Sequence, residues 1–201
     1  MNDGRSTYKA DLTAGSLKVA ESRVIASLLL ENASDEKWRQ ALKDDNQLQA
    51  RSPATAQRLA RLIRNRLETM TPDLWKLVKN GSSTVATHAC LAAAVKHSAL
   101  LADFLDLVVR EQYQIFAEKL THKHWHDFVA ECQNRDPDLS QWSESTIKRL
   151  RSSVLQILQQ VGYIDNTRSL RLQTVHLSGE VVRYLENHDE GSVLRCIQVT
   201  P

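Results

Sequence analysis

An arginine-rich stretch, RSPATAQRLARLIRNRL at residues 51–67, carries the clearest chemical signal in the sequence. It contains five arginines and no carboxylate, although the formal net charge of the whole chain is only +2. Guanidinium groups bind phosphate oxygens and guanine edges, and amide side chains bind adenine edges. A helix with such a face can bind a nucleic acid, and the alternative reading is an ordinary solvated face.

A second stretch, SESTIKRLRSSVLQIL at residues 143–158, has the same design. Aligned without gaps against residues 52–67, it agrees at five positions. These pairs are Ser52 with Ser143, Thr55 with Thr146, Arg58 with Arg149, Leu59 with Leu150, and Leu67 with Leu158. A shorter helix with a tryptophan, Trp38 or Trp125, is expected before each stretch. This order is typical of a helix-turn-helix arrangement.

Helical geometry separates the two faces of each basic helix. The first should bury Leu59, Ile63, Leu67 and Met70, and the second Ile147, Leu150, Val154, Ile157 and Val161. Arg66 points toward the apolar side and is expected to have a structural role, such as an ion pair. After the second helix, GYIDNTRSLRLQTV predicts a β-hairpin, the wing of a winged helix, with Arg168 in its turn and Arg171 on its next strand. The predicted DNA-binding residues are Arg51, Gln57, Arg58, Arg61, Asn65, Ser145, Lys148, Arg149, Ser152, Gln156, Arg168 and Arg171.

The elements that must position these side chains are mainly helices, because apolar residues recur at intervals of three and four. Helices are expected from Leu17 with Ser16 as N-cap, from Ser34, from Ser52–Pro53, around 74–78, over 83–119 with a break near 97–100, from Thr121, from Ser143 to Val161, and from Ser178. RDPDLSQW, residues 135–142, is expected as a loop and SVLRCIQV, residues 192–199, as a terminal strand.

The predicted fold class is therefore mainly α, with two small helix-turn-helix-type modules. The expected domains are an N-terminal helical one over residues 1–118 and a C-terminal winged-helix-like one over residues 119–201. A chain of 201 residues fits two small domains of about a hundred residues each.

Composition argues against secretion and membrane insertion. The opening MNDGRSTYKADLTAGS has no apolar core behind a basic start, so no secretory signal is predicted. The apolar segment at residues 84–109 is interrupted by His88, Lys96, His97, Asp103 and Asp106, which favours a buried helix over a membrane span. The three cysteines form no CxxC pair, which is typical of buried thiols in a reducing compartment. A cytoplasmic location is expected.

No set of residues predicts catalysis. In HKHWH, His122 and His126 lie one helical turn apart, but HExxH is absent and no nearby cysteine or carboxylate completes a metal site. Cys90 and His88 resemble a nucleophile and base, yet on a helix they fall on different faces. Glycine-rich phosphate loops and GxSxG are absent. We expect no enzyme activity, no cofactor and no bound metal.

The chain resembles the BrxA family, the small NusB-like accessory proteins of the BREX phage-resistance system. The likeness runs through ESRVIASLLLEN, DEKWRQAL, TAQRLARLIRNRLE, LADFLDLVVREQY, HWHDFVAEC and WSESTIKRLRSSVLQILQQVGYI. The resemblance implies a cytoplasmic all-helical protein with helix-turn-helix or winged-helix modules. It also implies binding to double-stranded DNA, and work beside a DNA methyltransferase and ATPases in antiviral defence.

Three functions follow as hypotheses. The leading one is a non-enzymatic protein that binds double-stranded DNA through two basic helices and a wing. The alternative is a scaffold whose helices over residues 83–119 dock a larger defence enzyme. RNA binding, by analogy with NusB-like folds, ranks third, because Trp38, Trp75, Trp125 and Trp142 are spaced as buried residues rather than stacking platforms. Sequence specificity, oligomeric state and whether both modules bind one duplex stay open.

Overall fold

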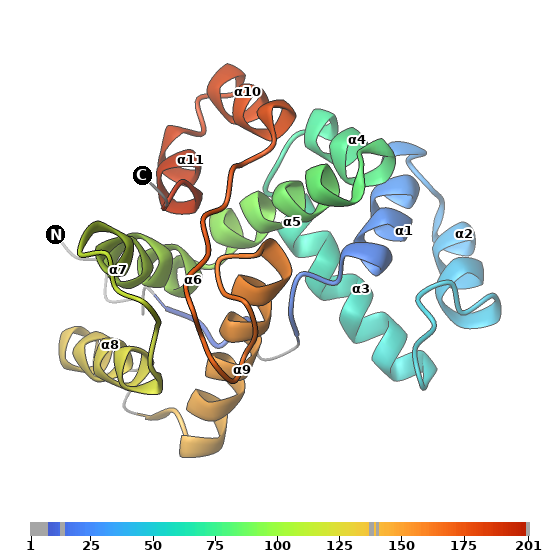
Figure 1. The fold of residues 1–201 in the computed structure, drawn as a ribbon. Helices are drawn as coiled ribbons and strands as arrows, with labels where there is room; N and C mark the ends of the chain where they lie inside the picture. Colours follow the sequence, from blue (N-terminus) through green and yellow to red (C-terminus); the bar gives the residue numbers. More distant parts are fainter. Residues whose placement is uncertain (1–7, 13–14, 137–138, 140, 200–201) are drawn as a thin grey trace, which may run out of the picture. The chain divides into compact units, whose positions relative to one another are not determined.

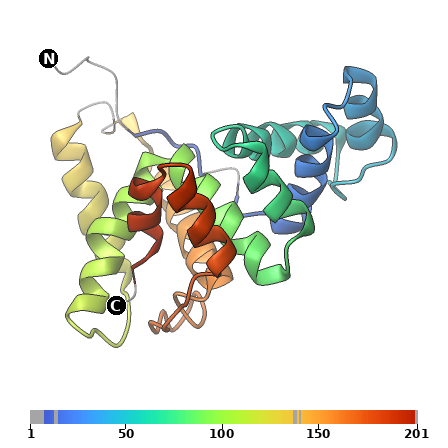
Figure 2. The ribbon, with the colours of Figure 1, turned by 90° about the horizontal axis from the view of Figure 1, so that it is seen from above.

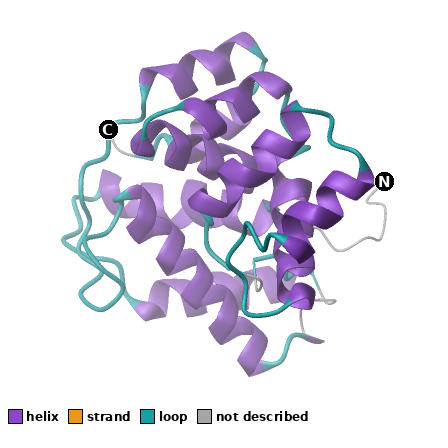
Figure 3. Ribbon diagram, turned by 90° about the vertical axis from the view of Figure 1, so that its right-hand side faces the viewer, coloured by secondary structure: helices purple, strands orange, loops and turns teal. Residues whose placement is uncertain are grey.

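The structure, a computed structural model, describes residues 8–12, 15–136, 139 and 141–199 (Figure 1). Over these residues the chain is mainly helical, as the sequence predicted, and they contain no β-strand (Figure 3). None of the helices formed by the described residues is long and apolar enough to cross a bilayer. Part of the expected loop at residues 135–142 and part of the polar opening lie outside the described residues.

The chain divides into two compact units. The first comprises residues 1–16, 98–176 and 195–201, and the second comprises residues 17–97 and 177–194. The domain boundary suggested between residues 118 and 119 falls inside the first unit. One basic helix belongs to each unit.

The second unit is built on a helix that is buried along most of its length. This helix, α5 (Ser83–His97), is rich in alanine, which lets neighbouring helices approach closely. Its neighbours are α1 (Val19–Leu30), α3 (Pro53–Leu67), α4 (Pro72–Asn80) and α10 (Gly179–Asn187) (Figure 1). An arm formed by α2 (Asp35–Arg39) and the π-helical η1 (Gln40–Asp44) contacts α3 through η1.

The first unit has an aromatic centre. Its helices are α6 (Ala99–Asp103), η2 (Phe104–Val109), α7 (Arg110–Gln114), α8 (His122–Arg135) and α9 (Glu144–Val161). Phe104 of η2 packs edge-on against Trp125 and Phe128 of α8, with ring centroids 5.1 and 5.3 Å apart. The break expected near 97–100 is present, since α5 ends at His97 and Ser98 is extended.

Local capping explains why most helix starts were predicted correctly. Ser52 accepts a hydrogen bond from the Thr55 N–H at 3.3 Å and is followed by Pro53, and Ser143 accepts one from Thr146 at 3.2 Å. Each bond satisfies one backbone N–H that the first helical turn leaves free. The first helix is the exception. It begins at Val19 after Lys18, which has a left-handed φ of 55°, so the prediction of Ser16 as its N-cap was wrong.

The β-hairpin predicted after α9 does not form as two strands. Within the described residues the segment makes isolated antiparallel bridges only, Ile164 with Leu172 and Lys119 with Arg171. Leu170 is buried in a left-handed conformation with φ 56°, which interrupts the extended backbone that a strand requires. The connection is a loop that folds back on itself (Figure 2).

The terminal strand predicted at residues 192–199 was also wrong, because α11 (Gly191–Ile197) occupies this position. Val193 and Ile197 lie one helical turn apart and are both buried, which is the helical period. The Arg110 guanidinium donates to the Gln198 carbonyl at 2.9 Å and also to the Arg195 carbonyl, which satisfies acceptors at the end of α11.

Candidate nucleic-acid interface

The outer face of α9 gathers four of the predicted residues at one site. Lys148, Arg149, Ser152 and Gln156 are exposed and line an open hollow of about 270 Å³, together with Ser153. The buried side of the helix carries Leu150, Val154, Ile157 and Val161, as predicted, whereas Ile147, also predicted to be buried, is half-buried. Ser145 is also exposed, and its hydroxyl is 2.9 Å from that of Ser143.

One carboxylate stands at the edge of this face. Glu144, in the first turn of α9, lies 2.7 Å from the Lys148 ammonium, and this contact lowers the pKa of Glu144. Arg149 has no such partner among the described residues. The face therefore combines one free guanidinium with one ammonium that is paired within its own helix.

The outer face of α3 is the equivalent surface in the second unit. Gln57, Arg58, Arg61 and Asn65 are all exposed, and so is Arg51 just before the helix. Neither Arg58 nor Arg61 pairs with a carboxylate in the part of the chain that the structure describes. Exposed and uncompensated guanidinium groups on one helix face are available to an external anion.

Two further arginines of α3 have structural positions. Arg66 is 3% exposed, which agrees with its predicted inward direction. Arg64 was not singled out from the sequence. Its guanidinium pairs with Glu68 at 2.7 Å and lies 5.1 Å from the centre of the Trp38 ring, so it holds α3 against the α2–η1 arm.

The loop after α9 presents the remaining two predicted residues. Asp165 accepts hydrogen bonds from the Ser169 hydroxyl at 2.6 Å and from the Arg171 N–H at 3.0 Å, and the Ser169 bonds lower the pKa of Asp165. Asn166 accepts the Arg168 N–H at 2.9 Å. These bonds fix the turn. The Arg168 side chain is exposed, and the Arg171 Nε lies 3.6 Å from Glu118.

Tyr113 is a positioning residue that no local sequence pattern indicated. Its buried hydroxyl reaches the carbonyls of Tyr163 at 3.0 Å and Gln173 at 2.7 Å, at the two ends of the loop. Burial raises the pKa of Tyr113 to about 12. These contacts link residues 50 and 60 positions apart, so no local pattern reveals them.

The histidine and cysteine candidates are not assembled into a reactive site. His124 accepts the Thr121 N–H through Nδ1 at 3.3 Å, so it caps α8, while His122 and His126 are exposed. No group of three His, Cys, Asp or Glu side chains able to hold a metal ion occurs among the described residues. Burial raises the pKa of the Cys90 thiol to about 11, which opposes a nucleophilic role.

Comparison with known proteins gives consistent matches along the chain. The BrxA family model matches residues 6–189. A protein named BREX protein BrxA from Paramagnetospirillum magneticum is 51% identical over 193 residues, covering 96% of this chain and 97% of that protein. Another of the same name from Escherichia coli O9:H4 is 34% identical over 188 residues, covering 94% and 88%. A crystal structure of an uncharacterized protein from Magnetospirillum magneticum superposes with a TM-score of 0.88 at 49% identity, covering 96% and 99% of the two chains.

Proposed function

Since this chain belongs to the BrxA family, we propose that it is a cytoplasmic, non-enzymatic component of a BREX phage-defence system that binds double-stranded DNA. The observation that carries the proposal is the outer face of α9, where Lys148, Arg149, Ser152 and Gln156 line one hollow. Cations bind phosphates, and amide, hydroxyl and guanidinium groups bind base edges in a major groove. The exposed face of α3 repeats this chemistry.

The order of elements around α9 supports a winged-helix reading of this module. Residues 118–120, α8, α9 and the loop of residues 163–173 follow one another as in a winged helix. The Leu120 N–H donates to the Leu170 carbonyl at 2.9 Å, and the Asp165 N–H donates to the Arg171 carbonyl at 3.0 Å. The loop then acts as a short wing without strands, and Arg168 at its turn contacts the DNA backbone. We likewise read α2–η1 followed by α3 as the second helix-turn-helix.

The test is a fluorescence-anisotropy titration with a DNA duplex and a single-stranded RNA of equal length. If about five phosphates are contacted, duplex affinity falls several hundredfold between 50 and 200 mM salt. Arg149→Glu and Arg58→Glu each weaken binding sharply and lower the salt slope by about one. Matched charge reversals at Arg135 on α8 and Lys76 on α4, both paired within their own helices, leave affinity unchanged.

Either of two results contradicts this function. One is the absence of duplex binding at low salt. The other is an equal loss of affinity in the control variants, since binding would then follow net charge rather than these faces. Tighter binding of the RNA than of the duplex would favour the third hypothesis, RNA binding. The expectation that the four tryptophans are buried holds for Trp125, which is 3% exposed, but was wrong for Trp38, Trp75 and Trp142, which are half-buried.

A second candidate function, docking of a larger BREX protein such as the methyltransferase or an ATPase, is favoured by exposed apolar side chains on η2 and just after the end of α7. Leu107, Ile115 and Phe116 are 48%, 63% and 88% exposed. Phe116 has a left-handed φ of 54°, fixed by the bond from its N–H to the Tyr113 carbonyl at 3.1 Å. Exposed apolar patches commonly mark protein interaction sites. Nuclease-resistant co-purification with a BREX partner that is lost in Phe116→Ser would support docking.

A further inference from the structure

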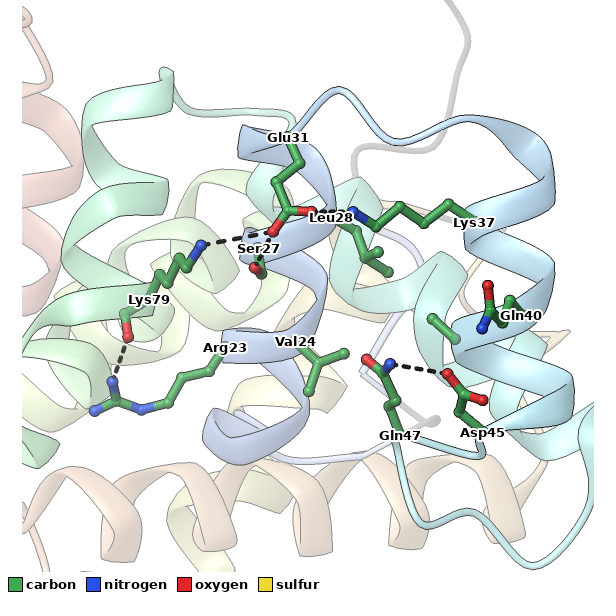
Figure 4. Close-up of a pocket in the computed structure, with 11 residues that line it drawn as sticks. Arg23, Val24, Ser27, Leu28, Glu31, Lys37, Gln40, Asp45, Gln47 and Lys79 are labelled. Atoms are coloured by element: carbon green, nitrogen blue, oxygen red, sulfur yellow. Dashed lines mark hydrogen bonds and ion pairs between the residues drawn. The ribbon is translucent and has the colours of Figure 1, made fainter.

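A cleft of about 570 Å³ lies in the second unit and contains none of the predicted DNA-binding residues (Figure 4). Its walls come from α1, from the α2–η1 arm and the residues just after it, and from the last turn of α4. The volume falls within the range of about 300–1,000 Å³ that small-molecule sites occupy. We propose that this cleft binds a small organic phosphate of about the size of a nucleoside monophosphate.

Two lysines in the cleft already hold an oxyanion, the carboxylate of Glu31. Lys37 donates a hydrogen bond to one oxygen, and the Lys79 ammonium lies 3.7 Å from the other. The Ser27 hydroxyl donates to Glu31 at 2.8 Å. The two lysines approach Glu31 from opposite sides (Figure 4). Donors converge here on one anionic group, which is the arrangement that a phosphate requires.

A third cation leaves this end of the cleft with a positive excess. The Arg23 guanidinium donates to the carbonyl oxygens of Lys79 at 2.7 Å and Gly81 at 2.8 Å. No carboxylate pairs with it among the described residues. The cleft thus holds three cations, Arg23, Lys37 and Lys79, against two carboxylates, Glu31 and Asp45. This excess favours an anionic ligand.

The rest of the lining suits the organic part of such a ligand. Val24 and Leu28 of α1 give an apolar floor, and Gln40, Asp45 and Gln47 give hydrogen-bond donors and acceptors on the opposite wall. This wall follows from the π-helical turn, in which the Asp45 N–H donates to the Gln40 carbonyl five residues back at 2.9 Å. Turns of this type are frequent at functional sites. An apolar floor with a few polar groups is typical of a ligand site.

Glu31 competes with the phosphate in this arrangement. Its side chain is 40% exposed and that of Lys37 is 55% exposed, and ion pairs at this exposure contribute little to stability. A doubly charged phosphate can therefore displace the carboxylate from the two ammonium groups. It follows that Glu31→Gln strengthens phosphate binding, whereas a purely structural role for Glu31 gives no such gain.

The experiment is isothermal titration calorimetry of the full chain at low salt, with AMP, ribose 5-phosphate and adenosine as probes. AMP is expected to bind at one site, ribose 5-phosphate more weakly, and adenosine not at all. Lys37→Ala and Lys79→Ala each reduce AMP affinity by about tenfold or more, since each removes a charge-assisted hydrogen bond. Lys76→Ala is the matched control, because Lys76 lies one turn before Lys79 on α4 and pairs with Asp73 instead.

Several outcomes overturn the proposal. These are no heat with AMP or ribose 5-phosphate on the wild type and on Glu31→Gln, adenosine binding as tight as AMP binding, and an equal loss in Lys76→Ala. The proposal does not depend on DNA binding. Arg58→Glu and Arg149→Glu are expected to keep the wild-type affinity for AMP, so failure of one proposal leaves the other standing.

Discussion

The imidazole of His88 accepts a hydrogen bond from the backbone N–H of Ser178 across 90 residues of sequence, with Nδ1 3.0 Å from the nitrogen. His88 lies in the middle of α5, and Ser178 is the N-cap of α10. The histidine is 2% exposed, and burial lowers its pKa from the ordinary value of 6.5. The neutral ring, with its proton on Nε2, therefore fixes the start of α10 against α5.

This bond makes the stability of the second unit sensitive to acid. Because the pKa of His88 is lower in the folded state, the unfolded chain binds the proton more readily. The stabilisation is complete above about pH 6.5 and is lost as the pH falls below it. Urea unfolding at pH 8, 6.5 and 5 is expected to give a decreasing free energy of unfolding over the acid interval.

Substitution of His88 distinguishes the effect of its hydrogen bond to Ser178 from the effect of its protonation. His88→Asn keeps an acceptor near the position of Nδ1 but cannot be protonated, so the pH dependence of its free energy of unfolding is expected to be flatter. Because the substitution also removes the buried ring, the variant is expected to be less stable at pH 8. His122→Asn, at the exposed start of α8, should keep the wild-type slope. A wild-type slope in His88→Asn would show that the acid sensitivity arises elsewhere.

The features predictable from the sequence are those whose cause is local. Ser52–Pro53 and Thr121 each define a helix start because the cap and the first turn are adjacent in sequence. The exposed faces of α3 and α9 follow from the helical period alone. The α11 helix was wrongly predicted to be a strand. The carbonyls of Arg195 and Gln198 at its end accept hydrogen bonds from Arg110, which lies 85 and 88 positions away, so no local pattern indicates how this helix ends.

The cleft that contains Glu31, Lys37 and Lys79 could not be predicted from the sequence either. It is formed by three separate elements, and Lys37, Glu31 and Lys79 come together only when α2 and α4 pack beside α1. The π-helical turn at Gln40–Asp44 has no marker in the residue pattern. Long-range packing, rather than propensity, decides such features.

Gly162 ends α9 in a conformation that other residues avoid. Its φ is 93°, and a Cβ placed there would meet Val175 at an ordinary 3.6 Å, so the cost of a side chain is conformational rather than steric. Gly162→Ala is expected to lower the free energy of unfolding by about 1–2 kcal/mol. Gly191→Ala is the control, since a Cβ at Gly191 meets nothing within 4 Å in the described structure. Urea unfolding of both variants tests this, and an equal effect of the two substitutions would refute the conformational argument.

The Tyr113 hydroxyl holds both ends of the loop after α9. Tyr113→Phe leaves the Tyr163 and Gln173 carbonyls without this donor, which should cost about 1–2 kcal/mol. Hydrogen exchange is expected to accelerate over residues 163–173 and to stay unchanged in α8. If the loop acts as a wing, the same variant weakens duplex binding without altering the charge of the protein. Unchanged exchange in the loop would mean that the backbone bonds alone fix it.

The ion pair of Glu144 and Lys148 is expected to weaken the proposed binding of α9 to DNA. The carboxylate lies 2.7 Å from the ammonium in the free protein, and phosphate would have to replace it while approaching a second negative charge. Glu144→Gln frees Lys148 and removes that repulsion, so duplex affinity is expected to rise by about two- to tenfold at low salt, with a steeper salt dependence. Glu131→Gln is the control, because Glu131 pairs with Arg135 on α8 outside the proposed surface. Anisotropy titrations of the two variants decide the matter. A gain in both would reflect net charge alone, and a gain in neither would indicate that Lys148 does not contact the duplex.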